Sequence, residues 1–365
     1  MSKLFEPLSF RHGPALKNRF VLAPLTNLQS HEDGRLSDDE YKWLTMRAEG
    51  GFALTMTCAA HVQAVGQGFP GQLGIFSDDH LPGLDRLAEG IKKHDSLAVV
   101  QIHHAGMRSP GDLIGCQPVA PSEDEETGAR ALSFGEVEQL IEDFILAAER
   151  AQRAGFDGIE IHGAHGYVLC QFLSAETNRR EDDFGGSLEN RSRPITQIID
   201  GIRSRCGEQF NIGLRLSPER FGIELTEATA LAQRVMSAGQ IDYLDMSLWD
   251  VFKEPADPAY RGRSLASYFT ELDRGEVRLG FAGKIRTPAD AVRCMESGVD
   301  FILLGRAAII HHDFPTQMAR DEGFEPVANP VSKAHLRKEG LGEAFVDYMT
   351  TWKGFVEGGS GQLDF

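Results

Sequence analysis

The sequence contains few cysteines, and none of them forms a metal-binding pair. Among 365 residues there are five, at Cys58, Cys116, Cys170, Cys206 and Cys294. No C-x-x-C pair occurs, which excludes the usual cysteine-rich zinc and iron–sulfur spacings. An odd number of widely spaced cysteines, with an N-terminus too polar to be a secretory leader, favours a reducing cytoplasm.

Long apolar runs and an excess of positive charge are also missing. No apolar run approaches the ~20 residues that a helix needs to cross a bilayer. The formal net charge is -17, and 41% of the residues are hydrophobic. Such an acidic chain is poorly suited to binding nucleic-acid phosphates, but it can bury a large core. We therefore expect a soluble cytoplasmic protein that binds neither nucleic acid nor a membrane.

What the sequence does contain is a repeated alternation of short apolar runs and amphipathic stretches. The runs are continuous, which is typical of parallel strands buried on both faces. Eight strands are predicted, at Phe20–Leu25, Ala53–Thr57, Ala98–Ile102, Gly158–Ile161, Ile212–Leu216, Tyr243–Met246, Arg278–Phe281 and Phe301–Leu304. Eight strand–helix units in one run predict an α/β fold, a (β/α)8 TIM barrel.

Capping signals mark the starts of several predicted helices. The S-x-x-E patterns at 37–40 and 133–136 predict two capping boxes. Thr287 followed by Pro288 predicts an N-cap and a proline in the first helical position. The helix after Ser133 has its apolar residues on one face and is expected to stop at Gly155.

The two ends of the chain do not follow the repeat. The residues before Phe20 predict a β-hairpin that caps the barrel floor and turns at Gly13-Pro14. The tail from Gly323 onward is expected to be partly helical, over 340–355. We therefore predict a barrel domain over residues 1–322 and a C-terminal helical extension over residues 323–365.

Polar residues gather where the predicted strands end, which is the catalytic face of such a barrel. The long segments Ala105–Leu132 and Ser247–Arg263 follow strands and are expected to act as substrate lids. Gly283 follows the seventh strand, and Gly305-Arg306 follows the eighth. Two glycines and an arginine at these ends indicate a phosphate site, although turn glycines and a surface arginine would give the same pattern.

Arg215 lies within an apolar strand, in G-L-R-L-S-P. An arginine inside a barrel is costly unless an anionic partner lies beside it. The partner could be a buried carboxylate, or the pyrimidine edge of a flavin, which carries negative charge when reduced. The residues alone leave both open.

His162, His165 and Tyr167 follow the fourth predicted strand. With His103 from the neighbouring strand, the histidines could bind a metal, as in barrel hydrolases. Such sites usually add an aspartate at the end of the eighth strand, where this chain has Gly305-Arg306. Without a metal, two imidazoles are hydrogen-bond donors for a carbonyl or nitro oxygen.

Several motifs occur in order along this chain. The densest is E-I-H-G-A-H-G-Y over residues 160–167. It is followed by N-x-R-x-D at Asn178, Arg180 and Asp182, and by G-G-S-x-E-N-R over 185–191. L-K-N-R-F-V-L-A-P-L-T lies near the start and F-I-L-L-G-R near the end. With these motifs the chain resembles the old yellow enzyme family of FMN-dependent ene-reductases, and the resemblance extends from Leu4 to Pro315.

The resemblance implies a role for each candidate residue. The isoalloxazine of a non-covalent FMN would be held by Pro24, Leu25, Thr26, Ala60, Gln101 and His162. Arg215 would lie against the N1 and O2 edge, and Gly283, Gly305 and Arg306 would hold the ribityl phosphate. His162 and His165 would grip the activating group of the substrate, and Tyr167 would be the general acid.

The implied activity is the reduction of activated C=C bonds in α,β-unsaturated carbonyl or nitro compounds. NADPH or NADH would be a transient reductant in a ping-pong cycle, since no G-x-G-x-x-G follows a predicted strand. A flavin-dependent oxidoreductase acting on amines or other small molecules remains an alternative, and a metal-dependent barrel hydrolase a more distant one. The expected partner is a small-molecule substrate, and the protein is expected to be a monomer or a homo-oligomer. Leu25, Met107 and Phe184 depart from common family residues, which leaves substrate size open.

Overall fold

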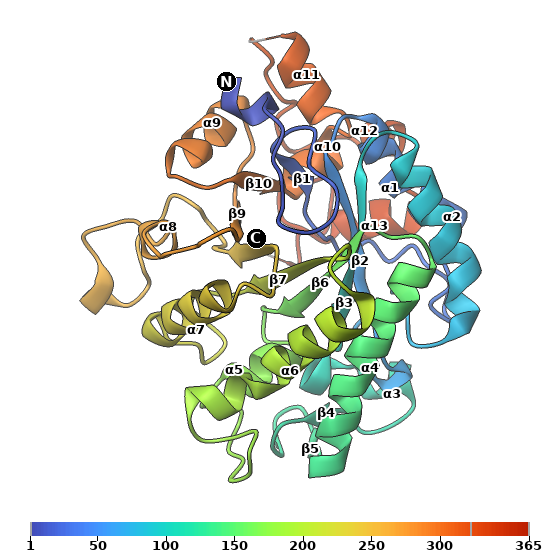
Figure 1. The fold of residues 1–365 in the computed structure, drawn as a ribbon. Helices are drawn as coiled ribbons and strands as arrows, with labels where there is room; N and C mark the ends of the chain where they lie inside the picture. The colour runs from blue at the N-terminus through green and yellow to red at the C-terminus, as the bar shows by residue number, and fades with distance from the viewer. Residues whose placement is uncertain (1, 322, 364–365) are drawn as a thin grey trace.

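The computed structural model describes residues 2–321 and 323–363 and has a closed parallel barrel at its centre (Figure 1). Its strands follow the order β1-β10-β9-β8-β7-β6-β3-β2. They are β1 (Phe20–Leu22), β2 (Leu54–His61), β3 (Leu97–His103), β6 (Gly158–Gly163), β7 (Asn211–Leu216), β8 (Tyr243–Ser247), β9 (Arg278–Ala282) and β10 (Phe301–Leu304). The predicted TIM barrel and its eight strands are confirmed. β1 ends at Leu22 rather than Leu25, and β2 continues to His61 rather than Thr57.

Helices surround the barrel (Figure 1). The longer ones are α1 (Asp38–Glu49), α2 (Leu81–Lys92), α4 (Phe134–Arg153), α6 (Leu188–Cys206), α7 (Leu225–Ala238) and α9 (Pro288–Glu296). Shorter ones are α3 (Gly111–Ile114), α5 (Val168–Leu173), α8 (Ser267–Thr270), α10 (Arg306–Ile310), α11 (Phe314–Arg320), α12 (Lys333–Lys338) and α13 (Glu343–Thr350). Single 3-10 turns are η1 (Ser2–Phe5), η2 (Ala64–Gly66), η3 (Asp78–His80), η4 (Gly106–Arg108) and η5 (Pro258–Tyr260). In the part of the chain that the structure describes, every helix is too short or too polar to span a bilayer.

The predicted caps form, with one exception. At the start of α4 the Ser133 and Glu136 side chains each accept from the other residue's backbone N–H, as a capping box requires. At the start of α1 only half of the box is present, because the Glu40 carboxyl is buried and accepts from Asn27 and Ser30 instead. Glu40 thus ties down the loop after β1 rather than the helix start.

The barrel core has an inner and an outer layer. The outer layer packs strand residues against the helices, and the inner one fills the lower part of the barrel with Leu54, Met56, Val99, Tyr243 and Phe301, among others. Successive residues of a strand pack alternately into the inner and the outer layer. Both sets are apolar, which is why the runs in the sequence do not alternate.

A bulge in β2 changes which residues face the barrel interior. The pairing of β2 with β3 shifts between Met56 and Ala59. Leu54 and Met56 face inward below the shift, and above it Ala59 pairs with Gln101 and faces inward, while Ala60 packs outward in the outer core. A bulge adds one residue to a strand and so reverses the alternation of faces.

The N-terminal segment covers the barrel floor, with less strand structure than predicted. Leu8 and Leu16 form one antiparallel bridge, with two backbone hydrogen bonds of 3.0 and 2.8 Å, and Gly13 turns at φ +75°. No longer strand forms here among the described residues. Leu8, Phe10 and Leu16 pack into the inner core from below.

The predicted lid after β3 contains short elements rather than a plain loop. It holds η4, α3 and a two-stranded piece made of β4 (Val119–Ala120) and β5 (Arg130–Ala131), which lies beside α4 (Figure 1). The loop after β8 contains η5.

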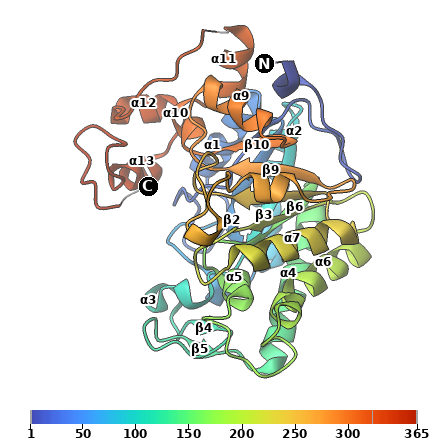
Figure 2. The same cartoon turned by 90° about the vertical axis from the view of Figure 1, so that its left-hand side faces the viewer.

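The C-terminal extension folds as two short helices, α12 and α13, instead of one helix over 340–355 (Figure 2). The backbone N–H of Gly342 donates to Gln29 Oε1 over 2.8 Å, and the Phe345 ring meets the Trp43 ring edge-on at 4.9 Å. Phe345 and Met349 are buried in the outer core. The extension is therefore fixed to α1 and the loop after β1. Residue 322, where the predicted domain boundary falls, lies outside the described residues.

Candidate active site

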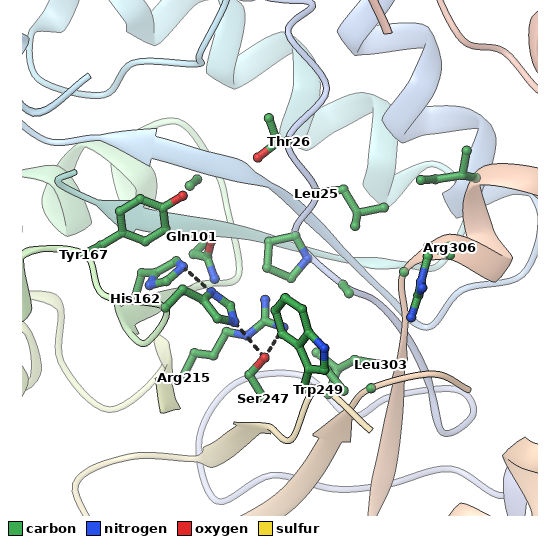
Figure 3. Close-up of a pocket in the computed structure, with 18 of the residues that line it drawn as sticks. Leu25, Thr26, Gln101, His162, Tyr167, Arg215, Ser247, Trp249, Leu303 and Arg306 are labelled. Atoms are coloured by element: carbon green, nitrogen blue, oxygen red, sulfur yellow. Dashed lines mark hydrogen bonds between the residues drawn. The ribbon is translucent and has the colours of Figure 1, made fainter. Parts of the chain in front are cut away.

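A cavity of about 530 Å³ opens where the barrel strands end. Eleven of the twelve predicted site residues line it (Figure 3). They are Pro24, Leu25, Thr26, Gln101, His162, His165, Tyr167, Arg215, Gly283, Gly305 and Arg306. Parallel strands all end at the same rim, so residues distant in the sequence meet there.

Ala60 is the exception. Its side chain packs in the outer core, and Ala59 lines the cavity in its place. The bulge in β2 causes this exchange, because it moves the inward-facing position from an even-numbered to an odd-numbered residue. Ala59 is thus the cavity residue that β2 supplies.

The two histidines are joined in a chain of hydrogen bonds. His162 Nδ1 accepts from the Ala164 N–H over 3.3 Å, so the Nε2 atom of a neutral His162 carries the proton. That atom lies 3.2 Å from His165 Nδ1, and His165 Nε2 lies 2.7 Å from Ser247 Oγ. Arg215 also donates to Ser247 Oγ, over 3.3 Å. In this network the Nε2 atom of each ring carries the proton and donates.

Both imidazoles are held in the neutral form. Burial lowers the pKa of His162 well below its usual value, and the neighbouring His165 and Arg215 lower it further. Burial likewise lowers the pKa of His165, followed by the charge of Arg215 and Arg108. Neutral imidazoles that each carry one N–H act as hydrogen-bond donors at neutral pH.

Tyr167 lies between aromatic and cationic neighbours. Its ring meets the His103 ring edge-on at 4.4 Å and the His162 ring at 5.1 Å. The Arg108 guanidinium lies 4.6 Å from the Tyr167 ring centroid and donates to the His165 carbonyl over 2.6 Å. Arg108 therefore fixes the phenol and the histidine loop in one arrangement.

Arg215 has a buried carboxylate partner, which was one of the two possibilities that the sequence left open. Its Nε atom is 3.0 Å from Asp245 Oδ2. The guanidinium also lines the cavity, beside Gln101, whose Nε2 donates to Glu160 Oε1 over 2.7 Å. Arg215 and Gln101 thus present fixed polar groups to the cavity floor.

Arg306 lies on the far side of the cavity from Tyr167 and His162 (Figure 3). Burial, and then the charge of Arg286, lowers the pKa of Arg306 to about 10, so it is still a cation at neutral pH. Gly283, Lys284 and Gly305 also line the cavity, and Gly305 directly precedes Arg306 in the chain. A Cβ at Gly283 would lie 2.8 Å from the Trp249 carbonyl carbon, so the loop after β8 can only pack here against glycine.

The cavity is cationic although the chain is acidic. Arg108, Arg215, Arg220, Lys284 and Arg306 line it, whereas no aspartate or glutamate does so within residues 2–321 and 323–363. The formal net charge of the whole chain is -17. A cleft lined by one sign of charge concentrates ligands of the opposite sign.

Several cavity residues were not predicted from the sequence. Arg108 and Trp249 come from the two predicted lids, but Arg220 and Phe221 follow β7, and Tyr348, Met349 and Trp352 come from the C-terminal extension.

Several of the residues that line the cavity have a strained backbone. Seven described non-glycine residues have positive φ, and five of them line the cavity: His165, Arg220, Phe221, Trp249 and Lys284. Strained backbone of this kind clusters at functional sites.

The residues fit the cofactor that the resemblance implies. A flavin mononucleotide has a flat ring with a polar pyrimidine edge and, at the other end, a phosphate. The cavity offers an amide and a guanidinium from Gln101 and Arg215 at its floor, and a half-buried cation at Arg306 on its far side. Its volume falls within the usual range for ligand sites.

Comparison with known proteins identifies the family of this chain. Residues 3–322 match the NADH:flavin oxidoreductase / NADH oxidase family. The probable NADH-dependent flavin oxidoreductase YqiG of Bacillus subtilis (strain 168) is 36% identical over 359 residues, which cover 94% of this chain and 96% of that protein. The old yellow enzyme homologue from Zymomonas mobilis has a TM-score of 0.79 and 26% identity, over 95% of this chain and 99% of its own. Morphinone reductase in complex with tetrahydroNAD has a TM-score of 0.77 and 26% identity, over 94% and 96%.

Proposed function

Because this chain belongs to the NADH:flavin oxidoreductase / NADH oxidase family, which includes the old yellow enzymes, we propose that it is an ene-reductase. It is an oxidoreductase with FMN as cofactor and NAD(P)H as reductant. Its proposed substrates are small molecules with a C=C bond activated by a carbonyl or nitro group. The observation that carries the proposal is the convergence of two neutral imidazoles and a phenol on the cavity that Arg215 and Gln101 line.

The proposed cofactor site uses both ends of the cavity. Gln101 and Arg215 would hold the pyrimidine edge, with Thr26, Pro24 and Leu25 along the ring. Gly283, Gly305 and Arg306 would hold the phosphate, where Lys284 adds a further cation. FMN, when bound, supplies the hydride.

His162 and His165 would bind the oxygen of the activating group. Each neutral ring carries one N–H, and the His162 Nε2 atom that now faces His165 Nδ1 at 3.2 Å can face a substrate oxygen instead. His165 would face the same oxygen through Nδ1, in the tautomer in which Ser247 Oγ donates to His165 Nε2. Donors fixed in this way draw electron density from the double bond, and each typically contributes ~10²–10⁴-fold to the rate. Tyr167 would then deliver the proton to the α-carbon. It borders the same cavity and is held by Arg108 and His103.

The test is to reduce the holoenzyme with NADH or NADPH without oxygen, and then to mix it with cyclohexenone or a nitroalkene. Rapid reoxidation of the flavin, together with formation of the saturated product, is the expected result. A holoenzyme that NAD(P)H reduces but that no activated alkene reoxidises would overturn the ene-reductase proposal. Amines could then be tested as electron donors.

A further inference from the structure

Beneath the candidate cofactor site, the barrel encloses two carboxyl groups and one guanidinium. Glu160, Arg215 and Asp245 occupy β6, β7 and β8, and Arg215 pairs directly with Asp245 in the strand register. The two carboxyl side chains are fully buried, and Arg215 is 6% exposed. Asp245 forms the ion pair with Arg215, whereas Glu160 forms none with any residue in the described part of the chain.

The free energy of the folded protein would rise if Glu160, Arg215 and Asp245 were all charged inside the barrel. Two carboxylates beside one guanidinium would leave one negative charge uncompensated inside the barrel. Asp245 already has the cation, so Glu160 is the group that keeps a proton. Burial, followed by the charge of Asp245, raises the pKa of Glu160 above its usual value.

The contacts of Glu160 suit a protonated carboxyl. Its Oε1 atom accepts from Gln101 Nε2 over 2.7 Å, and its Oε2 atom accepts no well-aligned hydrogen bond from the described residues. The Tyr243 hydroxyl lies beside the same carboxyl. It reaches this position because the Tyr243 ring crosses β7 at Gly213, where a Cβ would lie only 2.0 Å from Tyr243 Cζ. A proton on Oε2 would point toward the Tyr243 oxygen, which has no other partner among the described residues.

We propose that Glu160 is a positioning residue that holds a proton behind Gln101 and Arg215 and so keeps the floor of the flavin site electrically neutral. In its acid form it anchors the Gln101 amide and leaves Arg215 balanced by Asp245 alone. Loss of the proton places an uncompensated negative charge below the ring and makes reduction of the flavin less favourable. The inference rests on the proposed contacts of FMN with Gln101 and Arg215, not on the alkene chemistry.

The proton balance gives a measurable consequence. Where Glu160 is protonated throughout, two-electron reduction takes up the one proton that yields an anionic reduced ring. The anionic reduced ring raises the proton affinity of the Glu160 carboxyl. Where Glu160 is ionised in the oxidised enzyme and protonated in the reduced one, each two-electron reduction therefore also draws one proton from solvent onto that carboxyl. The other titratable groups that act on Glu160 are Arg215 on β7 and Asp245 and Tyr243 on β8. His162 and His103 lie further along β6 and β3, and burial keeps both neutral, so neither adds a proton over the same pH range.

The experiment is to measure the two-electron midpoint potential of the FMN holoenzyme from near-neutral to alkaline pH. The wild type is expected to change from about 30 mV per pH unit to about 60 mV per pH unit as pH rises, because one proton per two electrons corresponds to ~30 mV for each tenfold change. Glu160→Gln should stay near 30 mV per unit throughout, since the amide cannot ionise but can still accept from Gln101. Glu339→Gln is the control: it alters a buried glutamate that pairs with His312, and it should behave as the wild type does.

A wild-type slope that stays near 30 mV per pH unit over the whole range would overturn the inference. So would a Glu160→Gln variant whose slope still rises to about 60 mV per pH unit at high pH. If Glu160→Gln does not fold, the wild-type curve still decides, because a single slope is incompatible with a carboxyl whose proton affinity changes when the flavin is reduced. No alkene is present in these titrations. A failure to turn over enones would therefore refute the proposed function and leave this result unaffected.

Discussion

His165 Nε2 lies 2.7 Å from Ser247 Oγ, and this contact joins the histidine loop after β6 to the end of β8. Ser247 also accepts from Arg215, so one hydroxyl orients both a candidate substrate-binding group and a candidate flavin-binding group. The contact helps to hold His165 at φ +60°, a conformation that few non-glycine residues adopt. No motif in the sequence marks Ser247 for this role.

Replacement of Ser247 should therefore weaken substrate binding. In Ser247→Ala an imidazole nitrogen of His165 and a guanidinium N–H of Arg215 lose their hydrogen-bond partner, which costs ~1–3 kcal/mol per group. We expect kcat/KM for cyclohexenone to fall by about tenfold or more. Ser237→Ala, on the solvent side of α7, is the control. Equal kcat/KM values for the two variants would show that Ser247 does not orient the site.

Removal of the Tyr167 hydroxyl should separate the two halves of the catalytic cycle. Tyr167→Phe keeps the ring contacts with His103 and Arg108 and loses only the proton donor. Flavin reduction by NAD(P)H should continue unchanged, while reoxidation by an enone should slow by ~10²–10⁴-fold. Stopped-flow measurement of each half-reaction gives the result, with Tyr268→Phe as a control outside the cavity. Unchanged reoxidation would remove Tyr167 from the proton-donor role.

The His162 ring should also be needed for ligands that imitate a polarised substrate oxygen. A phenolate presents its oxygen to the same pair of N–H groups, so His162→Ala should weaken its binding. We expect the dissociation constant of a simple phenol to rise by about tenfold or more, since a hydrogen bond to a charged group contributes ~1.5–3 kcal/mol. The long-wavelength charge-transfer band recorded during titration gives this constant directly. An unchanged band and affinity would contradict the assignment.

Much of this molecule could be predicted from the sequence because parallel strands have a simple signature. Each strand is buried on both faces, so eight continuous apolar runs stand out, and their ends converge on one rim. The residues at those ends, such as His162 and Arg215, were therefore predicted together. The bulge in β2 was not predicted, because in T-C-A-A every residue is small and any of them can face either way. Ala60 was proposed for the cavity, and Ala59 lines it.

The contribution of the C-terminal extension could not be predicted for a different reason. Tyr348 and Trp352 reach the cavity only because Phe345 packs on Trp43 and Gly342 binds Gln29. These contacts join residues that are far apart in the chain, and no local pattern encodes them. The family match itself ends at residue 322.

The extension should influence which substrates enter. Trp352 meets Tyr348 edge-on at 5.9 Å, and both border the cavity. Trp352→Leu removes part of an aromatic wall, so a bulky β-aryl enone should gain roughly tenfold in kcat/KM relative to cyclohexenone. Phe134→Leu changes an exposed aromatic residue away from the cavity and is the control. An unaltered ratio of the two substrates would show that Trp352 does not limit access.

Acid should destabilise the fold through histidines that are buried in the neutral form. Burial is the main cause that lowers the pKa of His61 from 6.5 to about 4. Between these two pH values the unfolded chain binds a proton that the folded chain excludes, so stability falls as pH drops from 6.5 to about 4 and is unaffected by this group above 6.5. The full loss from His61 is roughly 3 kcal/mol. His61→Gln should therefore flatten the dependence of the urea-unfolding free energy on pH, whereas His31→Gln, at an exposed position, should leave it unchanged. If the two variants show the same pH dependence, His61 does not supply this acid sensitivity.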